Sequence, residues 1–143
     1  MLNKIPKILS PDFVKILMEM GHGDTIVLAD GNFPSETNGK RVVRADGHGV
    51  PELLDAVLEL MPLDVEYSEF PVSLMQVVAG DDTKPTIWNE YRDIINKHDD
   101  RDVKLEFVER FDFYDEAKKA YAVVATGEQA IYANIILKKG VVK

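Results

Sequence analysis

Residues 21–34 read GHGDTIVLADGNFP, and this stretch divides the chain into its first helix and first strand. The residues before it form an amphipathic run typical of a helix, which we expect to end at the first glycine of the stretch. Residues 25–29 form an apolar run of strand length, followed by an Asp-Gly turn pair. The stretch therefore predicts one chain reversal that gathers His22, Asp24 and Asp30.

Outward from this strand, helical and extended patterns alternate along the chain. We expect helices between residues 11 and 21, over 50–61, from 85 onward and over 113–120. We expect strands over 25–29, 41–45, 72–79, 104–109, 121–126 and 134–138. Residues 31–40 are polar and rich in turn formers, which indicates a loop. The alternation predicts an α/β fold: one domain over 1–143, built as a three-layer α/β/α sandwich with a mixed central sheet.

The composition limits the classes of partner. The chain has 143 residues, of which 45% are hydrophobic and 29% charged, as in ordinary globular domains. Its net charge of −8 argues against nucleic acid and anionic membranes, because both demand a basic surface. A phosphorylated substrate is disfavoured less, since one local arginine cluster could hold it.

The chain contains no cysteine, which excludes disulfides and a thiolate nucleophile and fits a cytoplasmic setting. Its first residues lack the apolar core of a signal peptide, and no apolar run approaches the ~18 residues of a membrane span. We therefore expect a cytoplasmic protein without membrane contact.

The sequence lacks the short motifs of several enzyme classes. There is no glycine-rich phosphate loop and no Gly-x-Ser-x-Gly elbow. The spacing of His22 and His48 fits no short metal signature, so we expect neither a metal nor another cofactor. His98 lies among charged residues, and we expect it to be solvated.

Two residues of the opening stretch are candidates for proton chemistry. His22 lies between glycines that leave its imidazole accessible, and imidazole groups exchange protons near neutral pH. The alternative is a histidine that only interacts with the carbonyl end of the preceding helix. Asp30 follows a strand and could contact a ligand, or it could simply form the turn. Asp24 is expected to bond nearby backbone amides.

Further candidates lie near the ends of later strands. Arg110 follows the strand expected over 104–109, with a surface arginine paired to a neighbouring acid as the alternative. Tyr132 and Asn134, with Ala133 between them, open the last strand and could offer a phenol and an amide to a polyhydroxylated ligand. The alternative is an interface tyrosine and a turn asparagine.

Six motifs in order along the chain resemble the fucose mutarotase family, within the broader group that includes ribose pyranase. The motifs are Met20-Gly21-His22-Gly23-Asp24, Ala29-Asp30 with Asn32-Phe33-Pro34, Arg44-Ala45-Asp46-Gly47, Glu109-Arg110-Phe111 with Phe113-Tyr114, Ala125-Thr126-Gly127-Glu128, and Tyr132-Ala133-Asn134-Ile135 with Lys138-Lys139-Gly140-Val141. Each motif alone is weakly specific, whereas their order across one domain is specific.

The resemblance implies an enzyme that interconverts the α and β anomers of free L-fucose. It implies that His22 is the catalytic acid/base and that the substrate is contacted by Asp30, Arg110 and the segment Tyr132, Ala133 and Asn134. It also implies no metal and a ring-shaped homodecamer with sites close to subunit contacts.

One position departs from the fucose pattern. Ala133 stands where the fucose branch often has glycine and the ribose branch has alanine. The ribose branch places histidine where this chain has Arg110, which favours fucose. The alternatives are a ribose pyranase, a non-catalytic sugar-binding module and a purely structural ring-forming protein.

Overall fold

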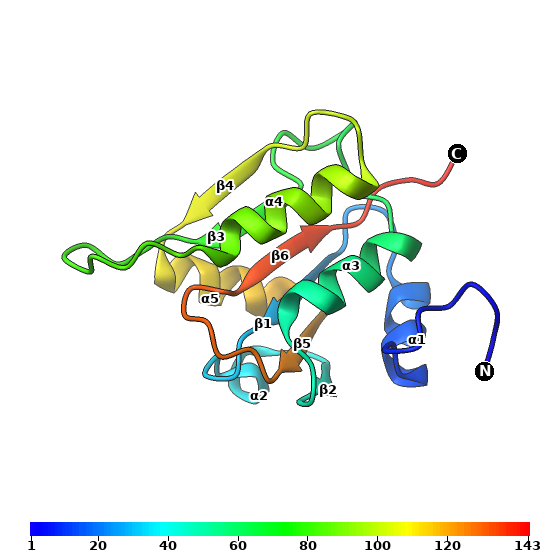
Figure 1. Ribbon diagram of the computed structural model, residues 1–143, viewed down its shortest axis with the longest axis horizontal. Coiled ribbons are helices and arrows are strands. Elements are labelled where there is room, and N and C mark those ends of the chain that lie inside the picture. Colours follow the sequence, from blue (N-terminus) through cyan, green and yellow to red (C-terminus); the bar gives the residue numbers. More distant parts are fainter.

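The computed structural model describes residues 1–143 and consists of one central sheet with helices on both faces (Figure 1). The strands are β1 Thr25–Ala29, β2 Val42–Ala45, β3 Val72–Met75, β4 Leu105–Val108, β5 Ala122–Thr126 and β6 Ile135–Lys138. The helices are α1 Pro11–Glu19, α2 Ser35–Asn38, α3 Val50–Leu60, α4 Ile87–His98 and α5 Arg110–Lys119. The predicted α/β sandwich with a mixed central sheet is confirmed.

The direction of the strands decides which residues can meet. The strand order is β2-β5-β1-β6-β3-β4, and only β6 runs antiparallel to its neighbours. Five strands therefore end, and β6 begins, at one edge of the sheet. We call this the carboxyl edge, which carries Asp30, Arg110 and Asn134. The opposite amino edge carries His22, before β1, and Lys139, after β6.

The core lies on both faces of the sheet because neighbouring side chains along a strand point to opposite faces. Ile26 and Leu28 of β1 join the larger apolar cluster, to which α1, α3 and α4 contribute. Val27 of β1 joins a smaller cluster with Phe113 and Ala117 of α5. Figure 1 shows α3 and α4 in front of the sheet and α5 behind it.

The first helix begins as expected but ends differently. The Ser10 side chain accepts a hydrogen bond from the backbone N–H of Phe13 (3.1 Å), an N-cap that the sequence predicts. At the other end, Met20 is already extended, and Gly23, not Gly21, adopts a positive φ of 85°. The left-handed turn therefore lies directly before Asp24 and β1.

Two other local predictions are wrong. Residues 35–38 form the short helix α2, in which Ser35 and Asn38 are buried, so this loop does pack. The strand expected over 72–79 stops at Met75, because β4 offers its last ladder partner at Val108. The residues that follow form a segment that projects from the molecule before α4 (Figure 1). None of the helices has both the length and the apolar character that crossing a membrane requires.

Candidate functional site

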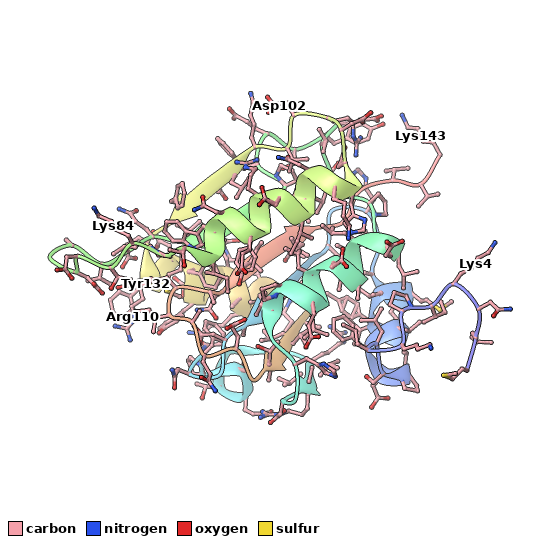
Figure 2. The ribbon with its side chains drawn as sticks, in the orientation of Figure 1. Lys4, Lys84, Asp102, Arg110, Tyr132 and Lys143 are labelled. Carbon is pink, nitrogen blue, oxygen red and sulfur yellow. The ribbon has the colours of Figure 1, made fainter.

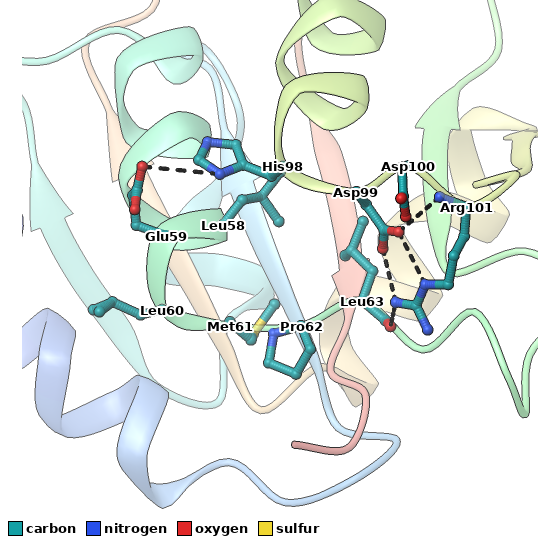
Figure 3. Close-up of a pocket in the computed structure, with 10 residues that line it drawn as sticks. All are labelled: Leu58, Glu59, Leu60, Met61, Pro62, Leu63, His98, Asp99, Asp100 and Arg101. Carbon is teal, nitrogen blue, oxygen red and sulfur yellow. Dashed lines mark hydrogen bonds and ion pairs between the residues drawn. The ribbon is translucent and has the colours of Figure 1, made fainter. Parts of the chain in front are cut away.

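Two of the cavities in the structure are of similar size. One, of about 340 Å³, lies where α3 and α4 end (Figure 3) and contains none of the site residues predicted from the sequence. Two of its polar side chains already have protein partners: Arg101 bonds to Asp99 (2.8 Å) and His98 to Asp55 (2.6 Å). The His98 side chain is only 11% exposed, so the expectation of a solvated histidine is wrong.

The second cavity, of about 330 Å³, lies at the carboxyl edge and is at the small end of the range for ligand pockets. We call it the carboxyl-edge pocket. It is lined by Asp30, Asn32, Phe33, Met75, Val78, Asp81, Arg110, Tyr114, Ile131, Tyr132 and Asn134. Four of the residues predicted from the sequence, Asp30, Arg110, Tyr132 and Asn134, therefore meet in one cavity.

Asp30 is a buried acid that follows the last residue of β1, beside the start of the antiparallel strand β6. Its carboxylate accepts a hydrogen bond from the backbone N–H of Asn32 (3.0 Å), and its own N–H donates to Oδ1 of Asn134 (2.8 Å). Burial raises the pKa of the Asp30 carboxyl, and hydrogen bonds, including one from the backbone of Ala133, partly oppose that rise. The turn alternative for Asp30 is thus also true, since one residue shapes the turn and lines the pocket.

The segment before β6 adopts an unusual backbone conformation. Tyr132 has a positive φ of 56°, which is uncommon for a bulky residue and persists only when neighbours hold it. Two aromatic residues of α4 do so: Trp88 Nε1 donates to the carbonyl of Tyr132 (2.8 Å), and the Tyr91 hydroxyl donates to the carbonyl of Ala133 (2.6 Å). The Ala133 side chain is fully buried in the core and does not line the pocket.

Arg110 is the first residue of α5 and points an unpaired cation at the pocket. Its Nε donates to the Tyr114 hydroxyl (3.0 Å), and it forms no ion pair, so the surface-pair alternative is wrong. The neighbouring Glu109 instead caps the helix by accepting from the N–H groups of Phe111 and Asp112. The terminal guanidinium nitrogens of Arg110 have no protein acceptor and can bind a ligand oxygen.

His22 lies at the other edge of the sheet. The strand β1 alone spans about 16 Å and separates it from Asp30, so the predicted gathering of these residues around one reversal is wrong. His22 Nε2 lies 3.2 Å from Oδ2 of the buried Asp64, and its side chain is 43% exposed. Asp24 accepts from the N–H of Gly21 (2.8 Å), a local contact as expected.

Sequence reasoning missed most of the apolar wall and part of the polar wall of the pocket. Phe33, Met75 and Ile131 lie within apolar or turn patterns that look like core. Tyr114 could have been predicted as a site residue, since it lies four residues after Arg110 and residues at that spacing meet on a helix. Val78 and Asp81 come from the projecting segment, where the apolar pattern wrongly predicted that the strand continues to residue 79. No group of three or more His, Asp or Glu side chains is arranged to hold a metal ion.

The pocket combines an apolar wall with an acid, a cation, an amide and phenols. Such a set at the carboxyl edge of the strands defines a small-molecule-binding α/β protein whose ligand carries several oxygens. The chain belongs to the RbsD / FucU transport protein family, which it matches over residues 3–142.

Individual relatives agree with this assignment. The chain is 50% identical to a fucose mutarotase of Mus musculus, with 97% of this chain and 94% of the mouse protein covered. It is 54% identical to the fucose mutarotase of Streptococcus pneumoniae, solved in complex with L-fucose, with a TM-score of 0.94 over 99% of this chain and 100% of that one. It also shares its fold with Bacillus subtilis RbsD, solved with D-ribose (24% identity, TM-score 0.70, covering 94% of this chain and 95% of that one).

Proposed function

We propose that this protein is an isomerase that interconverts the α and β anomers of L-fucose in the carboxyl-edge pocket. The observation that carries the proposal is the composition of that pocket, in a chain half identical to proteins named fucose mutarotase. L-fucose is a 6-deoxy sugar, with hydroxyls around its ring and a methyl group at C6. A pocket lined by apolar side chains as well as by Asp30, Arg110 and Asn134 can satisfy both.

The reaction needs only proton transfer. A proton is added to the ring oxygen and another is removed from the anomeric hydroxyl, so that the C1–O5 bond breaks and an aldehyde forms. Rotation about C1–C2 and the reverse proton transfers then close the ring with either configuration. Positioned acid–base groups typically accelerate such steps by ~10²–10⁴-fold.

The pocket residues divide the binding work by their hydrogen-bonding capacity. The Asp30 carboxylate accepts from sugar hydroxyls, and the free guanidinium nitrogens of Arg110 donate to sugar oxygens. Asn134 accepts from the backbone N–H of Asp30 through its Oδ1, and its side chain also hydrogen-bonds the Asp30 carboxyl, so it holds that acid in place for the sugar. Ala133 contributes through its backbone, because its side chain is buried.

We assign proton transfer to His22, acting on a sugar bound by another copy of the chain. Its Nε2 contacts Asp64, which orients the ring and leaves Nδ1 free. Because β1 holds it at the amino edge, it reaches a pocket only when two copies meet edge to edge. Exposed apolar side chains occur at both edges: Tyr67, whose ring lies against His22, and Val78 and Ile131, which line the pocket. They support contacts between copies of the chain. The ring-shaped homodecamer that we propose comes from the resemblance, and the cytoplasmic setting from the lack of cysteine.

NMR saturation transfer between the two fucose anomers tests the activity. We expect faster exchange with the protein than in buffer, and exchange at the buffer rate would rule out the proposal.

Mixing His22→Ala with Asp30→Ala subunits in one assembly tests the shared site. Each variant alone is expected to be inactive, whereas the co-assembled mixture regains activity at sites that combine an intact His22 with an intact Asp30. A mixture that stays inactive contradicts the shared site.

A sugar-binding module without catalysis is the second candidate, because one copy alone has the pocket but not the histidine. It predicts that fucose raises the thermal stability of the protein without changing anomer exchange.

Ribose pyranase activity is tested in the same experiment with D-ribose as the sugar. The buried position of Ala133 removes the one residue that favoured ribose, since its methyl group does not face the ligand.

A further inference from the structure

The segment between β3 and α4 reaches into the carboxyl-edge pocket. Val78 and Asp81 belong to this segment and line the pocket together with Tyr132. Figure 2 shows Tyr132 and Arg110 at the end of the molecule from which the segment projects. The positive φ of Gly80 (89°) turns the chain between Val78 and Asp81, so that both face the same phenol. The segment and the pocket thus meet at one side chain.

The contact uses most of the hydrogen-bonding capacity of the Tyr132 hydroxyl. The hydroxyl donates its only proton to Asp81 Oδ2 (2.6 Å). It accepts from the backbone N–H of Val78 (3.3 Å). A phenol has one donor hydrogen and two acceptor lone pairs, so one lone pair remains for a ligand.

Asp81 is itself held in place. Its Oδ1 accepts from the backbone N–H of Thr83 (2.9 Å) and from the Thr83 hydroxyl (2.6 Å), which leaves Oδ2 directed at Tyr132. These bonds lower the pKa of Asp81, while the bond to Asp81 raises the pKa of Tyr132. Asp81 therefore stays ionised and Tyr132 neutral at physiological pH, the states in which the phenol donates to the carboxylate.

We propose that Asp81 is a positioning residue of the sugar site: its carboxylate accepts the hydrogen bond donated by the Tyr132 hydroxyl, so that this oxygen faces the sugar only as a hydrogen-bond acceptor. The inference rests on the proposed function. It excludes Tyr132 as the acid that protonates the ring oxygen and makes its hydroxyl the hydrogen-bond acceptor for one sugar hydroxyl. The proton-transfer role then remains with His22.

Steady-state anomer exchange in four variants tests the proposal. We expect Asp81→Asn to raise KM for L-fucose about three- to tenfold with a smaller change in kcat, because a bound hydroxyl loses its oriented acceptor. Tyr132→Phe should match it, and the double variant should be no worse than Tyr132→Phe, because both remove one interaction. Asp82→Asn is the matched control, since the neighbouring Asp82 side chain makes no hydrogen bond or ion pair, and it should keep the wild-type KM.

A measurement without sugar separates this inference from the proposed function. In protein labelled with ¹³C at tyrosine Cζ, the pKa of Tyr132 should fall in Asp81→Asn, whereas Asp82→Asn should leave it unchanged. A wild-type KM in Asp81→Asn, additive effects in the double variant or an unchanged Tyr132 titration would each overturn the positioning role. Wild-type exchange at the buffer rate overturns the anomer activity instead, and the tyrosine titration then still decides whether Asp81 holds Tyr132.

Discussion

Under the proposed function, the two edges of the sheet carry different halves of one chemistry. The carboxyl edge gathers a buried acid, a free guanidinium and an amide around an apolar wall, which suits binding. The amino edge carries an exposed imidazole oriented by a buried acid, which suits proton transfer. Since β1 holds them about 16 Å apart or more, neither edge alone would form the complete site that we propose. The difference predicts that binding and catalysis can be altered separately in this protein.

The largest effect is expected at the amino edge. His22→Gln removes the proton-transfer group, so anomer exchange should fall by ~10²–10⁴-fold while the affinity for fucose changes little. Exchange is measured by NMR and affinity by thermal stabilisation. His48→Gln is the control, because His48 is a partly exposed histidine bonded to Glu52 and lies outside the pocket. A His22→Gln protein that binds fucose as weakly as a pocket variant would contradict the separation of the edges.

A smaller loss is expected at the carboxyl edge from Arg110→Ala. Removing the guanidinium should weaken fucose binding by about 10- to 100-fold, because hydrogen bonds from charged donors are the strong ones. The fucose affinity of Arg110→Lys should fall between those of this variant and the wild type, since lysine keeps the charge but lacks the planar set of guanidinium N–H donors. Isothermal titration of fucose measures both, and wild-type affinity in Arg110→Ala would exclude Arg110 from the site.

Each edge also depends on a glycine at a close approach of the backbone. A Cβ on Gly127 would overlap the carbonyl oxygen of Asp46, and one on Gly140 would overlap that of Leu63. Either change to alanine should destabilise the fold by about 1–3 kcal/mol. Urea unfolding checks this figure. Gly127→Ala should also weaken fucose binding, whereas Gly140→Ala should disturb the edge that holds Asp64. Equal stability of Gly127→Ala and the wild type would contradict the backbone contact.

Tyr91→Phe is expected to cost about 0.5–1.5 kcal/mol, because the carbonyl of Ala133 loses its buried donor. The effect should be confined to the carboxyl edge, since α4 holds the strained segment before β6 there. Amide hydrogen exchange should therefore quicken around residues 132–134 and stay unchanged around His22. Uniform quickening along the chain would mean that Tyr91 supports the whole core and not this segment.

The smallest effect is a pH dependence that belongs to the carboxyl edge. Burial raises the pKa of Asp30, so the folded protein binds this proton more tightly than the unfolded chain does. The free energy of unfolding of the wild type, relative to that of Asp30→Asn, should therefore increase as the pH falls through the raised pKa. The increase should be complete below the pKa that Asp30 has in the unfolded chain. Urea unfolding of both proteins between pH 7 and pH ~3 measures the difference. A relative loss for the wild type at low pH would contradict the raised pKa.

Much of the carboxyl edge could be predicted from the sequence, because strand ends are local features. Asp30 and Arg110 each follow a strand that the hydrophobic pattern locates, and parallel strands bring such ends together. The projecting segment could not be predicted, since its apolar residues 77–79 continue the pattern of β3 while the sheet offers them no partner. Asp81 was missed for that reason.

The His22 prediction shows the limit of reasoning from neighbouring residues. His22 and Asp30 are close in sequence, but an extended strand lies between them and carries them apart. Their separation depends on strand geometry, whereas their roles depend on what packs beside each: Asp64 from the chain after α3, and Asn134 from the start of β6.

The sequence by itself determined the alternation of helices and strands, the apolar faces that make the sandwich and the residue types available for binding, because these depend on local pattern and side-chain chemistry. Only the tertiary structure decided which of those residues share a pocket. That choice depends on strand order and direction, and above all on the single antiparallel strand β6, which brings Asn134 and Tyr132 beside Asp30 and takes Lys139 to the edge of His22.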